Sequence, residues 1–368
     1  MADNKIIQTV RGAIAPSELG FTSMHEHVLR ASDWPYQAIY KDLLGEIPEN
    51  RFPVLPDKPV AIEDLAYLHH SHHELSDTNG LDEPLMHDEV ADFGRFGGGA
   101  VLECGAPGIR GDVLGLKRIS EATDVHIIAS TGLYVEPSWP DVFRTMSRAD
   151  FADHIEREIS VGIDGTSIRP GQVKAAINGP WTEPFGAFLE AAAQSAAASG
   201  LCMTAHIEEC SQEEHRRVVD ELARFGMPLD RLILCHFQTH FQELELKKLV
   251  EDPTRFGLHL DYACEVLDRG AVICVDCFGI VYDDEPLGGI AESDAYKIAT
   301  VCHLLERGYE DQIVMGTDIF MKLMTWRFGG HGYVRLLNYV VPTLESLGIS
   351  TDTINKMCVT TPARLLAH

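Results

Sequence analysis

Two histidines two positions apart, His25 and His27, are the first residues of this chain whose spacing could support chemistry. They lie in the apolar run 21–28, which has the composition of a β-strand. Because alternate side chains of a strand share one face, both imidazoles should point the same way while Glu26 points away. Two neutral imidazoles suit zinc and similar divalent ions, so the pair predicts a metal site that other segments must complete. The alternative is two polar residues near a strand end.

The composition is that of a globular protein with a strong negative charge. Of the 368 residues, 45% are hydrophobic and 23% are charged, and the formal net charge is −26. This charge argues against nucleic acid or an anionic membrane surface as a partner. It does not identify which small-molecule substrate is bound. No apolar run approaches the roughly 18 residues needed to span a bilayer. The first residues lack a signal-peptide pattern and the nine cysteines lack C-x-x-C spacing, so we expect a cytoplasmic protein with reduced thiols.

A regular alternation of strand-like and helix-like segments begins after residues 97–99. Together with the run at 21–28 it predicts eight strands, and therefore a parallel (β/α)8 TIM barrel, which needs about 250 residues. The predicted strands are 21–28, 100–104, 126–130, 172–177, 201–207, 232–236, 271–275 and 313–316. The clearest predicted helices are 184–198, 212–225, 241–251 and 294–308.

Residues 30–97 interrupt this alternation with several prolines and a histidine-rich piece at 68–73. We expect one domain over residues 1–368, with this segment as a long excursion that ends in a helix at about 82–96. Because the excursion leaves from a strand end, part of it should cap the pocket, with Trp34, Tyr36 and Tyr40 as candidate wall residues. A surface ornament is the alternative. The histidine-rich piece favours a solvated helix surface over a metal site.

Further polar residues occur at the ends of the predicted strands, where catalytic groups of such barrels lie. They are Lys174 in the fourth strand, His206 at the end of the fifth, His236 at the end of the sixth and Asp318 after the eighth. An accidental gathering of these residues with His25 and His27 is the weaker explanation. His240 and His259 do not follow the pattern, and we expect them to be loop or surface histidines.

Lys174 is unusual because it lies in an apolar run, where an unpaired ammonium group would be expensive to bury. A desolvated lysine can lose its proton and add carbon dioxide, which gives a carbamate with two oxygens that can each bind a metal ion. Two ions bridged in this way, about 3.5–4 Å apart, can share a hydroxide that is nucleophilic at neutral pH. The alternative is an ion pair between Lys174 and Glu103 of the second strand.

Several motifs resemble those of the phosphotriesterase family of the amidohydrolase superfamily. They are Thr9-Val10-Arg11-Gly12 followed by residues 20–27, residues 107–112 and 131–134 after the second and third strands, Val173-Lys174, residues 275–279 after the seventh strand, and residues 360–366 near the C-terminus. The resemblance covers nearly the whole chain outside residues 30–97.

This resemblance implies a role for each strand-end residue. His25, His27 and Asp318 would hold the more buried ion, His206 and His236 the more exposed one, and carboxylated Lys174 would bridge the two. The bridging hydroxide would attack, Asp318 would carry a proton to the leaving group, and His236 would pass it to solvent. Zinc is the expected metal, although manganese and cobalt also accept these ligands. The resemblance also implies a homodimer.

The substrate is the least constrained prediction. Tyr134 matches a tyrosine that lactonases of the family often carry, but Cys277 stands where they often have an arginine. The loop 319–328, which contains Trp326, should form an apolar wall of the pocket. The alternative is a helical strip of the core, and Lys322 and Arg327 could instead meet an anionic group. We favour a lactone or other carboxylic ester as substrate. The alternatives are the same machinery acting on an organophosphate triester or an amide, and a non-catalytic metal-binding relative, against which the filled ligand positions speak.

Overall fold

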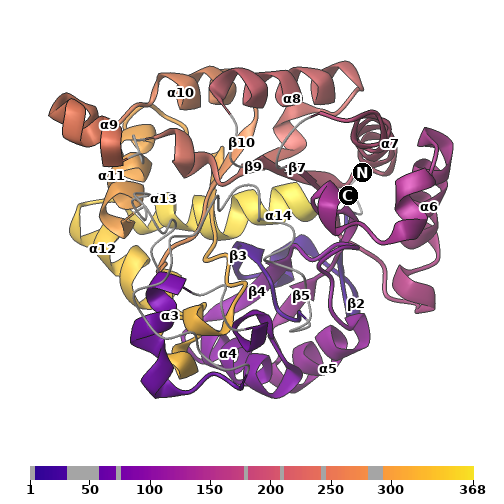
Figure 1. Ribbon diagram of the computed structural model, residues 1–368, viewed down its shortest axis with the longest axis horizontal. Coiled ribbons are helices and arrows are strands. Elements are labelled where there is room, and N and C mark those ends of the chain that lie inside the picture. The colour runs from indigo at the N-terminus through magenta and orange to yellow at the C-terminus, as the bar shows by residue number, and fades with distance from the viewer. Residues whose placement is uncertain are drawn as a thin grey trace.

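A ring of parallel β-strands surrounded by α-helices forms the body of the protein (Figure 1). The computed structural model describes residues 5–30, 58–71, 76–177, 181–207, 211–241, 246–280 and 293–368. Hydrogen bonds join the strands in two groups, β3 to β5 and β6 to β11, each in chain order. The bounds are β3 Phe21–Glu26, β4 Gly98–Glu103, β5 His126–Ile128, β6 Ser130–Leu133, β7 Gln172–Ile177, β8 Cys202–Ile207, β9 Leu232–Cys235, β10 Val272–Val275 and β11 Ile313–Met315. This is the predicted (β/α)8 barrel.

The predicted strands are confirmed, with one difference. The third predicted strand is divided at Ala129 into β5 and β6, and β5 pairs with β4 whereas β6 pairs with β7. Ala129 therefore marks the boundary between the two hydrogen-bonded groups of strands. Before β3, a hairpin of β1 (Ile7–Thr9) and β2 (Gly12–Ile14) leads into the barrel.

The helices form the outer layer, and polar side chains cap the N-termini of several of them. Asp82 accepts a hydrogen bond from the backbone N–H of Leu85 at 3.0 Å, and Ser211 accepts one from Glu214 N–H at 3.2 Å. The bounds are α4 Glu83–Arg95, α5 Val113–Thr123, α6 Arg148–Ser160, α7 Glu183–Ser199, α8 Gln212–Arg224, α9 Leu246–Glu251, α10 Asp261–Asp268, α11 Asp294–Leu305, α12 Val341–Ser346, α13 Thr351–Asn355 and α14 Thr361–Leu366.

The helix predicted over 294–308 was too long, since it ends at Leu305. The helix predicted over 241–251 is described from Leu246 to Glu251, and Phe241 follows the 3-10 turn Phe237–His240. Residues 242–245 lie outside the described part of the chain.

The excursion after β3 is described from residue 58, apart from residues 72–75. It contains α3 (Leu65–Ser71) and ends in α4, as predicted. Arg30 and Leu81 exchange two backbone hydrogen bonds, of 3.1 and 2.8 Å, so the excursion returns beside the end of β3. Trp34, Tyr36 and Tyr40 lie outside the described residues, so the capping hypothesis and the single-domain boundaries stay predictions.

Apolar side chains and thiols fill the barrel interior. Met24, Leu102, Cys104, Ile233, Cys235, Val272, Cys274 and Val314 form one buried cluster, which Leu365 and Leu366 of α14 join. The two ends of the described chain lie side by side (Figure 1), because Ile6 and His368 exchange two backbone hydrogen bonds of 3.1 and 3.0 Å. The eight described cysteines form no disulfide with one another.

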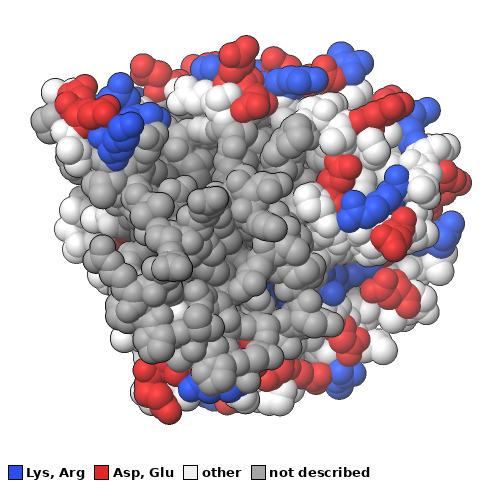
Figure 2. Space-filling view, in the orientation of Figure 1, with Lys and Arg blue, Asp and Glu red and all other residues white. Residues whose placement is uncertain are grey.

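Basic and acidic side chains alternate along the rim of the face shown in Figure 2. Ion pairs tie neighbouring helices of the outer layer, such as Arg118 of α5 with Glu83 of α4 at 2.7 Å and Arg216 of α8 with Glu265 of α10 at 2.8 Å. Such exposed pairs contribute little stability each, about 0–1 kcal/mol. Within the described ranges, no helix is both long enough and apolar enough to cross a bilayer.

Candidate metal centre

The carboxylate of Asp318 lies between the pair His25 and His27 on one side and His236 on the other, all at the strand ends. Its Oδ1 is 3.5 Å from Nε2 of both His25 and His27, and its Oδ2 is 3.7 Å from Nε2 of His236. Zinc ligands at about 2.0–2.1 Å from a tetrahedral ion are about 3.3 Å apart, so these atoms are close to ligand spacing. Oδ1 is buried and has no hydrogen-bond partner among the described residues. An unpaired, buried carboxylate oxygen facing two imidazole nitrogens fits a divalent cation.

Three residues of the site have a left-handed backbone conformation. His236, Cys277 and Asp318, which follow β9, β10 and β11, have φ angles of 55°, 57° and 48°. This conformation costs about 1–2 kcal/mol for a residue other than glycine, and such strain clusters at functional sites. A hydrogen bond from Asp318 N–H to the carbonyl of His25, 2.9 Å long, helps to hold the last of them.

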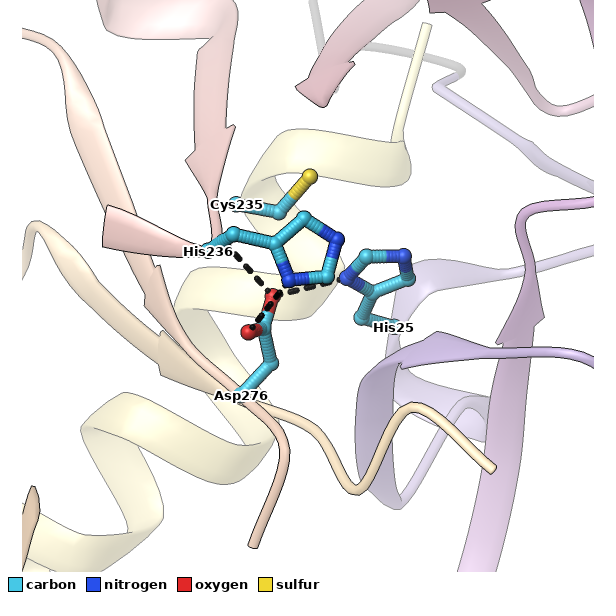
Figure 3. Close-up of side chains that lie close together, drawn as sticks. All are labelled: His25, Cys235, His236 and Asp276. Atoms are coloured by element: carbon cyan, nitrogen blue, oxygen red, sulfur yellow. Dashed lines mark hydrogen bonds and ion pairs between the residues drawn. The ribbon is translucent and has the colours of Figure 1, made fainter. Parts of the chain in front are cut away.

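Asp276, directly after β10, orients two of the histidines (Figure 3). Its Oδ2 accepts from His25 Nδ1 at 2.7 Å and from the backbone N–H of His236 at 3.1 Å. Its Oδ1 lies 3.2 Å from His236 Nδ1 and accepts from Gln238 Nε2 at 2.7 Å. The carboxylate therefore fixes the protons on the two Nδ1 atoms and leaves each Nε2 lone pair for a metal ion.

The sequence indicated Asp276 only as a member of the motif at residues 275–279, without a role of its own. The available signal was an aspartate directly after a predicted strand. Asp276 lies close to Cys235 as well as to the two histidines. The donor atoms of these four residues are near enough to one another to hold an ion: His25, Cys235, His236 and Asp276. However, both Asp276 oxygens already bond to histidines, and the Cys235 thiol donates to the carbonyl of Ala205 at 3.2 Å. We therefore interpret this group as the support of the site.

The protonation states suit metal ligands. Burial lowers the pKa of His25 to about 4, so its imidazole is neutral at pH 7. Burial alone would raise the pKa of Asp318, but His25, His236 and His27 lower it to about 2. Burial likewise opposes ionisation of Asp276, yet His236 and His25 hold its pKa well below the usual range. The site thus presents a neutral His25 imidazole and the anionic carboxylates of Asp318 and Asp276.

Glu26 points away from the histidines, as predicted, and supports Asp318 from the other side. Its Oε1 accepts from Thr317 N–H at 2.8 Å and its Oε2 from Ile319 N–H at 3.1 Å, and these two residues flank Asp318. Burial raises the pKa of Glu26 to about 8. This side chain therefore fixes the loop that carries Asp318 and does not serve as a ligand.

Lys174 of β7 is fully buried in the centre of the site. Its Nζ lies 3.3 Å from His25 Nε2 and 3.8 Å from Cys235 Sγ. The alternative partner, Glu103, instead accepts from the N–H groups of Gly105, at 2.6 Å, and Val28. Burial disfavours the Lys174 ammonium, but the nearby thiols and carboxylates outweigh burial and raise its pKa. The lysine thus stands among the predicted ligands and does not pair with Glu103.

The other predicted residues are divided between the site and the surface. The His206 ring lies 4.4 Å from that of His236 and 5.4 Å from that of Tyr134, measured between centroids. The Trp326 side chain is 49% exposed, and its backbone N–H donates to Glu89 of α4 at 3.0 Å. Its role as a pocket wall stays a prediction.

His240 and His259 are separate from the described ligands, as expected. The His240 ring packs against His215 and Tyr262, with centroid distances of 4.9 and 5.4 Å, and His259 is exposed.

The two cations of the loop 319–328 are engaged in ion pairs. Arg327 lies 2.6 Å from Asp92 and 3.1 Å from Glu89, both in α4. Lys322 Nζ donates to Asp77 at 2.8 Å. These bonds tie the loop to the excursion, so neither cation points to an anionic substrate group.

The comparisons with known proteins agree with the motifs. A model of the phosphotriesterase family matches residues 5–366. Human N-acetyltaurine hydrolase is 30% identical over 371 residues, which cover 98% of this chain and 97% of that protein. A phosphotriesterase-related protein of Nematostella vectensis is 28% identical over 96% of both chains.

Solved structures share the fold. A resiniferatoxin-binding protein from Rhodobacter sphaeroides is 28% identical with a TM-score of 0.79, covering 98% of this chain and 94% of that one. A lactonase from Listeria monocytogenes, at 21% identity and a TM-score of 0.72 over 98% of both chains, is similar in fold. Since the family model spans nearly the whole chain, the resemblance is confirmed, and this chain belongs to the phosphotriesterase family of hydrolases.

Proposed function

We propose that the protein is a binuclear metal-dependent hydrolase that cleaves the acyl–nitrogen bond of an N-acyl compound. The placement of Asp318 carries this proposal, because its Oδ1 faces His25 and His27 at 3.5 Å whereas its Oδ2 faces His236 at 3.7 Å. Such a carboxylate suits a site with two cations.

The ligands fall into two sets. His25, His27 and Asp318 would hold the more buried ion, His206 and His236 the second, and Lys174, carboxylated, would bridge them. When bound, the ions supply Lewis-acid polarisation of the acyl oxygen and water activated at neutral pH. The neutral His25 imidazole and the anionic Asp318 support this assignment.

Proton transfer falls to Asp318. Its carboxylate takes the proton of the attacking water and delivers it to the leaving nitrogen, because an amine departs readily only when it is protonated. Glu26 and the left-handed backbone at Asp318 hold the carboxylate in place for this step.

The relatives support an amide over an ester. N-acetyltaurine hydrolases are 26–30% identical to the chain over 98% of its length, whereas the lactonase from Listeria, at 21%, supports the fold alone. Lactone hydrolysis remains a second candidate because Tyr134, which matches a tyrosine that lactonases of the family often carry, lies beside His206.

Metal analysis and a substrate panel would test the proposal together. Protein reconstituted with zinc and bicarbonate should bind two ions per chain and hydrolyse N-acetyltaurine or another N-acyl amino acid. The panel should include N-acyl amino sulfonates and carboxylates, aliphatic lactones, aryl esters and a phosphate triester, with Asp318→Asn as the inactive control. Fewer than two ions would refute the binuclear site. A lactone with a tenfold higher kcat/KM, about 1.4 kcal/mol of transition-state preference, would refute the amide assignment.

A further inference from the structure

Glu103, the last residue of β4, lies behind the imidazole of His27. Its Oε1 is 3.8 Å from His27 Nδ1, whereas Nε2 of the same ring is 3.5 Å from Asp318 Oδ1. The ring therefore lies between two carboxylates, with one nitrogen facing each of them. All three residues are buried. Asp318 is one of the proposed metal ligands, but Glu103 has no part in either ligand set.

Backbone hydrogen bonds fix the Glu103 carboxylate in this position. Its Oε1 accepts from Gly105 N–H at 2.6 Å, and its Oε2 accepts from Val28 N–H. Because Val28 directly follows His27, the second bond keeps the carboxylate beside the His27 ring. The Glu103 backbone is held as well, since its carbonyl accepts from Ser130 Oγ at 2.5 Å.

The backbone of His27 is also fixed, from the opposite side. The hydroxyl of Tyr333, which is fully buried, donates to the His27 carbonyl at 2.8 Å. With this carbonyl and the following N–H both bonded, the ring can move mainly by rotation of the side chain. A rotation that shortens the distance of 3.8 Å by about 0.8 Å would bring Nδ1 within hydrogen-bond distance of Glu103 Oε1.

Asp276 has the corresponding place at two other histidines of the site. It accepts from His25 Nδ1 at 2.7 Å and lies 3.2 Å from His236 Nδ1. Histidines that bind a metal ion usually donate their second N–H to such a group, which fixes the ring and raises the basicity of the ligand nitrogen. Glu103 is the carboxylate that faces Nδ1 of His27.

We infer that Glu103 is a positioning residue for the more buried ion of the proposed centre. It accepts the Nδ1–H of His27 and so directs Nε2 of that ring toward the ion. Unlike Asp276, which contacts histidines of both ligand sets, Glu103 acts on one set only. The inference rests on the proposed function for the presence of the more buried ion.

Proton NMR of the zinc-loaded protein tests this role directly. In protein with isotope-labelled histidines, the Nδ1–H protons of His25 and His27 should both give downfield resonances, because each bonds to a carboxylate. In Glu103→Gln, the His27 resonance should move upfield or disappear by exchange with water, while that of His25 stays. Competition with a chromophoric chelator should show that the Kd of one zinc ion rises by about 10- to 100-fold and that of the other by less than about threefold.

Two control variants separate this role from a purely structural one. Glu89→Gln changes another buried glutamate that accepts from two backbone N–H groups, both in the loop 319–328, and it should change neither zinc Kd. Tyr333→Phe removes the bond to the His27 carbonyl but leaves Nδ1 facing Glu103, so the His27 resonance should remain.

Three results would overturn the inference. The first is a wild-type spectrum without a downfield His27 Nδ1–H resonance, which decides the question even if Glu103→Gln does not fold. The second is a Glu103→Gln variant that keeps this resonance and binds both ions as tightly as wild type. The third is equal weakening of both ions, because Glu103 would then only hold the ends of β3 and β4. A wild-type protein that binds one ion and still shows the resonance would instead refute the binuclear function and leave this inference intact.

Discussion

Replacing Asp276 by asparagine should weaken metal binding although Asp276 is not itself a proposed metal ligand. The carboxylate accepts hydrogen bonds from Nδ1 of His25, while its other oxygen faces Nδ1 of His236 at 3.2 Å. An asparagine has one acceptor oxygen, so it can serve only one of the two imidazoles. Its amide N–H groups would face the Nδ1–H of the other.

The expected magnitude follows from the bond that is lost. A hydrogen bond to a charged group contributes about 1.5–3 kcal/mol, and 1.4 kcal/mol is a factor of ten in an equilibrium constant. We therefore expect the zinc Kd to rise by roughly 10- to 100-fold, the range typical for groups that orient metal-bound histidines. The effect should be shared by both ions, because His25 and His236 belong to different ligand sets.

Competition with a chromophoric zinc chelator would measure the Kd of metal-free protein titrated with zinc. Asp64→Asn is the matched control, because Asp64 is also buried but pairs with Lys58 outside the site. The reasoning about Asp276 is refuted if its variant binds zinc within about threefold of wild type while both proteins stay folded.

Three further predictions concern the core of the site and its surroundings. Lys174→Ala should lose at least one ion and most activity, whereas Lys174→Glu should keep part of both, as judged by metal analysis and turnover. Gly132→Ala should lower the free energy of unfolding in urea by several kcal/mol, because the new Cβ would lie 1.9 Å from the Lys174 carbonyl oxygen and Gly132 has a positive φ. Gly226→Ala is the control: it also has a positive φ but open space around it, so it should lower the free energy of unfolding by only about 1–2 kcal/mol. Burial lowers the pKa of His215 to about 3 and that of His240 to about 4, from 6.5. The unfolded chain therefore binds more protons than the folded one below pH 6.5. The free energy of unfolding should fall as the pH drops from about 6.5 to 4. A His215→Gln variant with the same Tm loss as wild type across that range would contradict this assignment.

The sequence predicted the barrel well because its signals are local. Strand-like runs with polar residues at their ends locate β3, β7, β8 and β9 to within a few residues, and parallel strands bring those ends together. The predicted ligands His25, His27, His236 and Asp318 accordingly lie within a few ångströms of one another.

Contacts between distant segments could not be predicted in the same way. The bond between His25 and Asp276 joins residues 251 positions apart, and it exists only because the barrel brings the ends of β3 and β10 together. Trp326 is placed by Glu89, 237 positions earlier, rather than by the apolar pattern of its own loop. The left-handed backbone at Cys277 was likewise not predictable, because no glycine stands at this position to indicate a positive φ. The expected homodimer and cytoplasmic location stay predictions.

The division of the barrel into two hydrogen-bonded groups of strands has a consequence for handling the protein. His25 and His27 belong to the group β3 to β5, whereas His236 and Asp318 follow strands of the group β6 to β11. Bound ions would therefore add cross-links between the two parts, beside the backbone bond from Asp318 to His25 and the bonds from Thr317 and Ile319 to Glu26. A strong chelator should therefore lower the Tm of the protein without unfolding it at room temperature, and zinc added afterwards should restore both the Tm and the activity.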